Sequence, residues 1–318
     1  MLIKKAADIR SSEITPRSWY MDRRKFLAGS ALAGAAALAG GRLEEIWSPS
    51  RSVEANDKIS GIQSSPLSTN EKQTPYKDIT NYNNYYEFST DKYEPAGLAQ
   101  KFKTRPWTVT IDGAVKKKQK LDVDAIIKMA VPEERIYRHR CVEGWSIVVP
   151  WVGFSLSELI KRCDPLPKAK FVEFTTILDM TQMPGQHTNV LRWPYTEGLR
   201  MDEAMHPLTL LCFGLYGEVL PNQNGAPLRI VVPWKYGFKS AKAIVKISFT
   251  ESEPPTTWSE AAPSYYGFYS NVNPGVGSFR DQSSERRLGE FLKRKTLMFN
   301  GYDQVASLYS GMDLKKYY

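Results

Sequence analysis

The chain contains very little cysteine, three residues among 318. Three cysteines cannot build the disulfide framework of small secreted domains, so the fold has to rest on a hydrophobic core. Cys163 and Cys212 stand within apolar patterns and are predicted to be small buried side chains. Cys141 differs, because it directly follows Arg138-His139-Arg140 and is the one cysteine in a polar, cationic setting.

Histidine is equally scarce, and the common nucleotide motifs are missing. His139, His187 and His206 are far apart, with no HxxxH or CxxC spacing in the chain, so we do not expect a zinc site. The sequence has no GxGxxG, Walker or GxSxG pattern, which argues against a standard dinucleotide, NTP or α/β-hydrolase site. Cys141 therefore remains the main candidate for chemistry.

No long run of one charge sign occurs, although the formal net charge is +9. Residues 1–55 hold nine Lys/Arg and six Asp/Glu, which leaves +6 for the remainder. Lys116-Lys117-Lys118 is typical of a solvated hairpin turn, and no Lys/Arg-rich run follows a predicted helix face. The charge pattern therefore gives no reason to expect nucleic acid as a partner.

The N-terminal segment, residues 1–55, has the layout of a removable export signal. Arg23-Arg24-Lys25 precedes a charge-free, Ala/Gly-rich stretch from Phe26 to Gly41, which resembles a twin-arginine signal. This stretch is shorter than the roughly 20 apolar residues that span a bilayer. We therefore expect export of the folded protein to the periplasm, with cleavage after Ala39 or Ala55, and a Ser/Pro/Asn-rich linker over residues 56–80.

The rest of the chain, residues 81–318, is predicted to be a single domain. Strands are expected at 107–111, 135–140, 146–149, 170–177, 208–213, 228–232 and 243–249, and helices at 123–129, 155–163 and 201–204. Ser155 and Glu158 have the spacing of a helix capping box. Strands outnumber helices without regular alternation, so the predicted fold class is α+β and β-rich. The aromatic region after Glu253 is expected to wrap the same core.

Cys141 is expected at the end of the strand 135–140, with Gly144 allowing a sharp turn after it. Nearby cations favour the thiolate, which is the form that binds metals. Strict strand alternation, however, places Arg138 and Arg140 on the face opposite Cys141. A structural, half-buried cysteine is the alternative interpretation.

Two loops rich in glycine, amides and basic residues flank the strand at 228–232. Residues 222–229 lead into it and residues 233–242 lead out of it. Their side chains include Arg229, Lys239, Ser240 and Lys242, which could hold an anionic group such as a phosphate. Ordinary turns with solvated lysines are the alternative.

Seven dispersed stretches resemble the sulfite-oxidase-like molybdopterin enzymes, in particular their methionine-sulfoxide reductases. They are residues 82–88, Glu134 to Arg138 with Cys141-Val142-Glu143, residues 182–186, 202–209, 223–227, 233–239 and 254–258. The likeness continues from about residue 80 to the C-terminus, including Asn300-Gly301-Tyr302. The resemblance implies the mixed, β-rich molybdopterin-binding fold of that family in a single domain.

The same resemblance implies a molybdenum–molybdopterin (Mo-MPT) cofactor and assigns roles to individual residues. Cys141 would be the catalytic residue and the molybdenum ligand. The residues that would hold the pterin and its phosphate are Asn83, Tyr86, Glu87, Thr176, Asn224, Arg229, Ser240, Ala241 and Lys242.

The activity implied is the reduction of methionine sulfoxide in oxidised envelope proteins, which reverses a polar lesion. Electrons would come from a haem-containing integral-membrane subunit fed by quinones. One alternative is the oxidation of sulfite or another small oxyanion on the same cofactor, which predicts a closed, basic substrate pocket. Another is an exported binding protein without cofactor, which would tolerate Cys141→Ser and contain no molybdenum.

Overall fold

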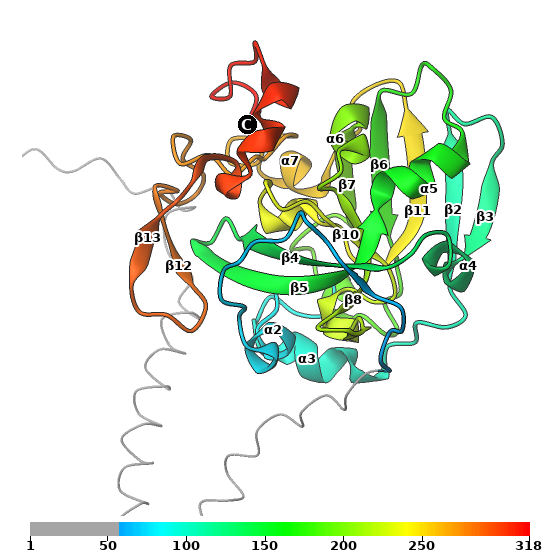
Figure 1. Ribbon diagram of the computed structural model, residues 1–318, viewed down its shortest axis with the longest axis horizontal. Helices are drawn as coiled ribbons and strands as arrows, with labels where there is room; N and C mark the ends of the chain where they lie inside the picture. Colours follow the sequence, from blue (N-terminus) through cyan, green and yellow to red (C-terminus); the bar gives the residue numbers. More distant parts are fainter. Residues whose placement is uncertain (1–56) are drawn as a thin grey trace, which may run out of the picture. The chain divides into compact units, whose positions relative to one another are not determined.

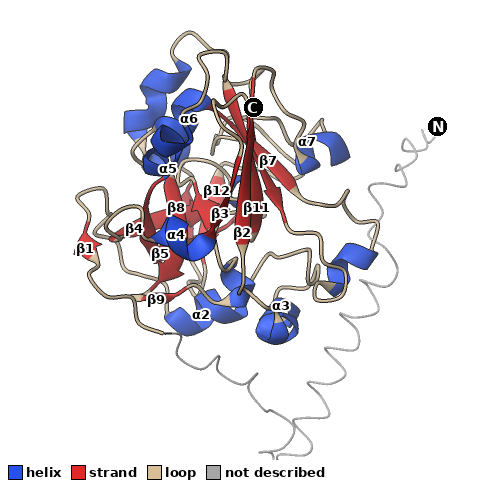
Figure 2. Ribbon diagram, turned by 90° about the vertical axis from the view of Figure 1, so that its right-hand side faces the viewer, coloured by secondary structure: helices blue, strands red, loops and turns tan. Residues whose placement is uncertain are grey.

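Two mixed β-sheets carry the fold, and short helices lie around them (Figures 1 and 2). The computed structural model describes residues 57–318. The predicted export signal and its cleavage sites lie outside the described residues. Within residues 57–318, no helix combines the length and apolar character needed to cross a membrane.

The larger sheet has eight strands, and its centre is the long strand β5. The whole length of β4 pairs antiparallel with β5. On the other edge of β5, β8 and β12 pair with different halves of this strand. The strands of this sheet are β1 (Gln63–Ser64), β4 (Glu133–Arg140), β5 (Trp145–Ser155), β8 (Leu210–Leu215), β9 (Glu218–Val219), β10 (Arg229–Val231), β12 (Ser284–Arg287) and β13 (Lys293–Lys295).

The smaller sheet has the order β3-β2-β11-β6-β7, and β11 lies at its centre. β11 pairs parallel with β2 and antiparallel with β6. These strands are β2 (Thr108–Gly113), β3 (Gln119–Asp122), β6 (Phe171–Thr176), β7 (Thr196–Arg200) and β11 (Ile244–Thr250). The mixed sheets, with helices outside any regular βα alternation, confirm the predicted α+β class.

The helices are short, and several connections are single turns of 3₁₀ helix. The α-helices are α2 (Tyr76–Asn81), α3 (Glu94–Leu98), α4 (Val123–Ile127), α5 (Leu156–Cys163), α6 (Met201–Met205) and α7 (Thr257–Ala261). The 3₁₀ turns are η3 (Ala99–Lys101), η4 (Pro184–His187), η5 (Asn222–Asn224), η6 (Gly237–Lys239), η7 (Met298–Gly301) and η8 (Asp303–Tyr309).

The strand β5 is longer than its sequence pattern suggests. The predicted strand ended before Pro150, but β5 continues to Ser155 because both of its neighbours, β4 and β8, supply pairing partners for the second half. Nine consecutive residues of β5 are buried, as expected for a strand covered on both faces. Cys163 and Cys212 are buried side chains, as predicted.

The capping box predicted at Ser155 is wrong. Ser155 does precede α5, but its side chain makes no capping hydrogen bond. Its hydroxyl accepts a hydrogen bond from Arg135 at 2.9 Å and donates to the Pro207 carbonyl at 3.1 Å. Glu158 pairs with Lys161 at 2.8 Å instead. The Ser155 hydroxyl is thus hydrogen-bonded to groups far away in the sequence, the Arg135 guanidinium and the Pro207 carbonyl, and is not available to cap the helix.

The segment expected as a linker, residues 56–80, packs on the domain where the structure describes it. β1 pairs parallel with β4, and the Val148 N–H donates to the Thr74 hydroxyl at 3.0 Å. Ile79 and Thr80 are buried on α2. This packing fixes the start of the loop that follows α2, where Asn83, Tyr86 and Glu87 are found.

Candidate cofactor site around Cys141

Cys141 is the first residue of a tight turn between β4 and β5. The Cys141 N–H donates to the Trp145 carbonyl at 2.9 Å, and the Gly144 N–H donates to the Cys141 carbonyl at 3.1 Å. Gly144 has a φ of +90°, a conformation that glycine adopts without strain. The turn leaves the sulfur half-buried, where it accepts hydrogen bonds from Asn84 Nδ2 at 3.3 Å and from the Glu143 N–H at 3.4 Å.

The basic flank of Cys141 does not face the sulfur. Arg138 pairs with Glu71 at 3.2 Å, and Arg140 is buried and pairs with Glu285 at 2.8 Å. The guanidinium of Arg140 also donates to the Cys141 carbonyl, so it contacts the backbone of the turn. Strand alternation therefore decides the orientation of both arginines.

The expectation that these cations favour the thiolate is accordingly wrong for the polypeptide itself. Burial and the neighbouring Glu143 carboxylate raise the pKa of the Cys141 thiol to about 12, and the nearby cations offset only part of this. A thiolate at this position would need a bound metal cation to stabilise it, since coordination deprotonates a thiol.

The predicted cofactor residues come from five separate segments that meet beside the Cys141 turn. Asn83, Tyr86 and Glu87 lie in the loop after α2; Thr176 ends β6; Asn224 ends η5; Arg229 begins β10; and Ser240, Ala241 and Lys242 connect η6 to β11. Thr176 pairs with Ile244 of β11, and Arg229 donates to the Asn224 carbonyl at 2.7 Å and the Ser240 carbonyl at 3.4 Å. Backbone pairing thus draws these segments together.

Two asparagines of this set present buried acceptors that nothing in the described chain satisfies. The side-chain amides of Asn83 and Asn224 both donate to the Ile79 carbonyl, at 2.9 and 3.0 Å. Their amide oxygens, together with the Thr176 hydroxyl and His139 Nδ1, are buried and have no hydrogen-bond partner within residues 57–318. Unpaired buried polar atoms are costly, so such a cluster indicates a bound group rich in hydrogen-bond donors. A pterin ring fits this requirement.

Two cations, Arg229 and Lys242, complete the set, and neither is held in an ion pair within residues 57–318. Burial lowers the pKa of Arg229 to about 10 and that of Lys242 to about 8, the latter opposed in part by Glu87. The N–H groups of Ala241 and Lys242 likewise donate to no acceptor within this part of the chain. These donors and charges fit a phosphate.

The other lysines of the 233–242 loop are already neutralised. Lys239 lies 2.5 Å from Glu197, and Lys235 lies 2.7 Å from Glu203, with all four side chains buried. The suggestion that Lys239 helps to hold an anion is therefore wrong, because the Glu197 carboxylate of β7 already neutralises its charge. The pairs instead fix the loop that carries Ser240, Ala241 and Lys242.

Sequence reasoning missed several side chains around the sulfur. His139 lies on the Cys141 face of β4, and burial beside Arg229 and Lys242 lowers its pKa to about 3, so it is neutral. Glu143 accepts hydrogen bonds from Lys92 at 3.0 Å, Trp145 Nε1 at 3.0 Å and Asn84 at 3.4 Å. Period-two alternation could have identified His139, whereas Lys92 and Asn84 are brought in by the loop after α2.

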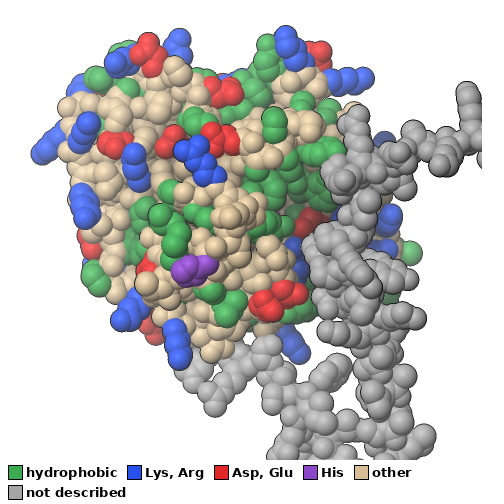
Figure 3. All heavy atoms as spheres, turned by 180° about the vertical axis from the view of Figure 1, so that it is seen from behind, with side chains coloured by type: hydrophobic (Ala, Val, Ile, Leu, Met, Phe, Trp, Pro, Cys, Tyr) green, Lys and Arg blue, Asp and Glu red, His purple; other side chains and the backbone are tan. Residues whose placement is uncertain are grey.

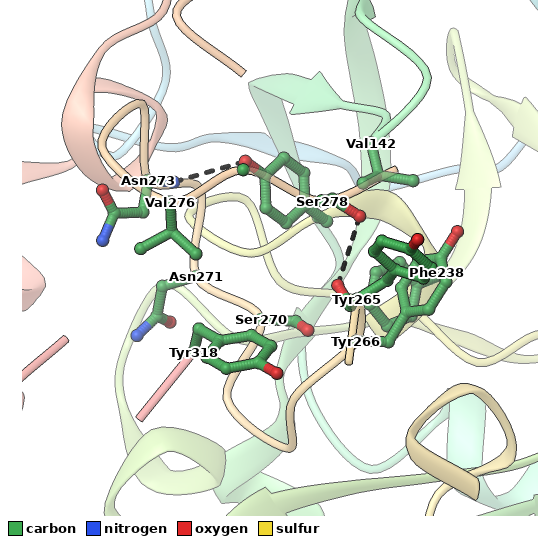
Figure 4. Close-up of a pocket in the computed structure, with 12 residues that line it drawn as sticks. Val142, Phe238, Tyr265, Tyr266, Ser270, Asn271, Asn273, Val276, Ser278 and Tyr318 are labelled. Carbon is green, nitrogen blue, oxygen red and sulfur yellow. Dashed lines mark hydrogen bonds between the residues drawn. The ribbon is translucent and has the colours of Figure 1, made fainter. Parts of the chain in front are cut away.

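An aromatic wall adjoins the Cys141 turn. Cys141 packs against a small cluster that contains Val142, Tyr236 and Tyr266. Trp258 lies 4.7 Å from Tyr266 and 5.7 Å from Tyr86, measured between ring centroids. Tyr266 of this wall also lines a shallow hollow, partly open to solvent, where Phe238, Tyr265 and Tyr266 gather near Val142 (Figure 4). The surroundings of the sulfur are thus aromatic on one side and polar on the other.

The loop that carries Tyr86 and Glu87 depends on one glycine of η4. A Cβ atom added at Gly185 would lie 2.1 Å from the Tyr86 carbonyl oxygen and 2.8 Å from that of Glu87. The backbone of η4 can therefore approach this loop only with glycine at position 185.

Gly185→Ala is expected to displace the Tyr86–Glu87 loop, with an overpacking cost of about 1–3 kcal/mol. We expect a lower thermal midpoint and a reduced pterin content in the purified protein, measured by fluorescence of the released pterin. Gly97→Ala is the matched control, because no atom lies within 4 Å of the Cβ position at this helical glycine. Unchanged midpoint and pterin content in Gly185→Ala would contradict this account of the loop.

Comparison with known proteins agrees with this arrangement. Residues 96–258 match the family model described as "Oxidoreductase molybdopterin binding domain". The protein-methionine-sulfoxide reductase catalytic subunit MsrP of Ralstonia nicotianae is 53% identical over 336 residues, and that of Burkholderia mallei is 54% identical over 334 residues. Both alignments cover 100% of this chain and 100% of the relative.

Among solved structures, the sulfane dehydrogenase SoxCD of Paracoccus pantotrophus has a TM-score of 0.41 and 16% identity, over 67% of this chain and 54% of that chain. This likeness is too low to carry an argument beside the full-length relatives. On the strength of those relatives and of the matched domain, the chain belongs to the MsrP family of protein-methionine-sulfoxide reductase catalytic subunits, within the sulfite-oxidase-like molybdopterin enzymes.

Proposed function

We propose that this protein is a molybdenum–pterin oxidoreductase that reduces methionine sulfoxide in other proteins to methionine. The names of its full-length relatives support this reaction, and so does the donor set of the site. Cys141 would coordinate the molybdenum, and Asn83, Thr176 and Asn224 would accept hydrogen bonds from the pterin. Arg229 and Lys242, with the N–H groups of Ala241 and Lys242, would hold its phosphate. Tyr86 and Glu87 would contact the same cofactor from the loop after α2.

When bound, the cofactor would supply the redox chemistry: the sulfoxide takes up two electrons and two protons and is converted to a thioether and water. The chain itself supplies orientation. Asn84 and the Glu143 N–H hold the Cys141 sulfur in one position, and the Lys92–Glu143 pair fixes the polar side of the Cys141 turn. The aromatic wall of Trp258 and Tyr266 gives an apolar surface against which a thioether sulfur packs well.

The observation that carries the choice of substrate is the charge balance at Cys141. The basic side chains that precede Cys141 in the sequence are paired with carboxylates, Arg138 with Glu71 and Arg140 with Glu285, and Lys92 beside the turn pairs with Glu143. Arg280 is the exception, because its guanidinium donates to the Glu143 carbonyl at 3.0 Å and its side chain is exposed to solvent. A sulfite site needs cations that are free to bind a dianion. Beside the sulfur lie a carboxylate and aromatic rings, and the Arg280 guanidinium contacts the backbone of the turn. This setting favours a neutral substrate such as a sulfoxide over a dianion.

We further infer that the chain acts in the periplasm after twin-arginine export, with oxidised envelope proteins as substrates. The support is the arginine pair and the charge-free stretch of residues 23–41. We also infer a haem-containing membrane protein as the electron donor, because the reaction consumes two electrons per turnover and the resemblance to this family implies such a donor. Cell fractionation, with Arg23→Lys/Arg24→Lys as the variant that blocks export, tests the location.

The proposed reaction is tested on the purified holoprotein. Metal and pterin are quantified first, and the protein is then assayed with a reduced viologen as donor. An oxidised, methionine-rich protein is expected to be reduced, with conversion of its methionine sulfoxide followed by mass spectrometry. The same protein before oxidation is the control. Sulfite oxidation that exceeds sulfoxide reduction, or a protein purified without molybdenum from a molybdate-replete host, would contradict the proposal.

A further inference from the structure

The hairpin of β12 and β13 carries the most exposed apolar side chains of the described chain. Phe291 is 92% exposed and Leu292 is 81% exposed, and the two are adjacent in the turn that joins the strands. The hairpin forms the outer end of the larger sheet and projects from the body (Figure 1). Two adjacent apolar side chains with this degree of solvent exposure indicate a surface that contacts another molecule.

One face of the hairpin gathers unpaired positive charge. Arg286 lies opposite Lys293, and Ser284 lies opposite Lys295, in the antiparallel register. Because side chains alternate along a strand, Arg286, Lys293 and Lys295 share one face. All three are exposed, and none forms an ion pair within residues 57–318. Like charges directly across a ladder are unfavourable, so an anionic partner would relieve this arrangement.

The opposite face of the same hairpin is neutralised. Arg287 lies 2.5 Å from Glu71, and Arg294 pairs with Glu290. The unpaired positive charge therefore belongs to one face of the hairpin and not to the basic segment as a whole. On the far side of the molecule, Lys and Arg side chains are scattered among other surface groups (Figure 3).

We infer that this hairpin docks the protein on an anionic phospholipid surface. Phe291 and Leu292 would enter the boundary between headgroups and acyl chains, while Arg286, Lys293 and Lys295 contact lipid phosphates. Exposed apolar side chains next to a basic face are the combination that binds membrane interfaces. An acidic protein surface would match the cations equally well, but two protruding side chains would need a preformed pocket there, whereas lipid accommodates them without one.

Docking through this hairpin would also orient the cofactor site. β12 pairs with the start of β5, and the Arg286 N–H donates to the Gly144 carbonyl at 2.9 Å. The Leu288 N–H donates to the Ser146 carbonyl at 2.9 Å. The hairpin is thus hydrogen-bonded to the turn that presents Cys141, so lipid contact would hold that turn close to the membrane surface. This placement suits a site that exchanges electrons with a membrane-bound donor.

The test compares the full chain with its hairpin variants in flotation assays with vesicles. We expect binding to vesicles of equal parts phosphatidylglycerol and phosphatidylcholine, and little to phosphatidylcholine alone. Phe291→Ser/Leu292→Ser and Arg286→Gln/Lys293→Gln/Lys295→Gln should each lower the partition coefficient at least about tenfold. Raising the salt from about 50 to about 500 mM should weaken binding of the parent chain.

The matched control is Lys117→Gln/Lys118→Gln/Lys120→Gln, which removes the same charge from another exposed hairpin, that of β2 and β3. It should bind vesicles like the parent. Circular dichroism and the thermal midpoint verify folding without relying on the enzymatic reaction. The inference is overturned if hairpin variants and parent bind equally, if the control loses as much binding, or if no vesicle binds. In the last case, binding to an acidic protein surface would explain the basic face.

Discussion

Cys141→Ser is expected to lower turnover with a methionine-sulfoxide protein by at least about 1000-fold, the scale found for residues that touch the reacting centre. Serine keeps the size and the hydrogen bonds of the turn, but its alcohol is a far weaker ligand for a soft metal than a thiolate. The measurement is viologen-coupled turnover per molecule of pterin, so that loading and activity are separated.

The same variant should retain much of its pterin. Arg229, Lys242 and the amides of residues 241–242 lie at the phosphate end of the proposed site, and the substitution leaves them intact. Cys163→Ala is the matched control, since Cys163 is buried on α5 and belongs to the main core. If Cys141→Ser turned over at the parent rate with molybdenum bound, the assignment of Cys141 as the metal ligand would fail.

Lys242→Met should reduce cofactor affinity by about 10- to 100-fold, the value of one charge-assisted contact of about 1.5–3 kcal/mol. Lys242 lies 4.5 Å from the centre of the Tyr85 ring and forms no ion pair in the described chain, although the Glu87 carboxylate acts on its charge. A structural lysine would stabilise the protein without cofactor. Here the lowered pKa shows that the chain alone disfavours the charge, so the cofactor-free variant should keep or gain thermal stability.

Lys246→Met separates this effect from a general loss of positive charge. Lys246 lies four residues further along the chain, in β11, and pairs with Asp112 at 3.4 Å on the surface. Pterin content and the thermal midpoint of cofactor-free protein are measured for both variants. A Lys242 variant that loses stability without cofactor and binds pterin normally would show that this lysine is structural.

About half of the regular elements were readable from local pattern, among them the central strands β5 and β11 of the two sheets. Apolar alternation and β-branched residues located seven strands, and the same alternation correctly set Arg138 and Arg140 on the face opposite Cys141. The other six strands of the described chain, β1, β3, β7, β9, β12 and β13, were not predicted. β12 and β13 are polar and basic, and they owe their pairing to β5 and to each other. The Ser155 cap failed for a similar reason, since Arg135 and Pro207 compete for its hydroxyl.

The candidate site residues could be named from the sequence, but the sequence did not show which of their charges are neutralised by other residues. The family resemblance supplied Cys141 and nine candidate cofactor residues only as positions in the sequence. It gave no means to see that Lys239 is neutralised by Glu197 while Lys242 is not, or that Glu143 and Lys92 form a pair beside the sulfur.

The sequence by itself determined the class of fold, the single cysteine in a polar setting and the family, because these depend on periodicity, composition and short motifs. Only the tertiary structure decided which charges are free. Ion pairs form between residues far apart in the chain, such as Arg140 with Glu285, and burial then sets the pKa of whatever remains unpaired. The open acceptors of Asn83 and Asn224 and the unpaired charge of Lys242 are consequences of that packing.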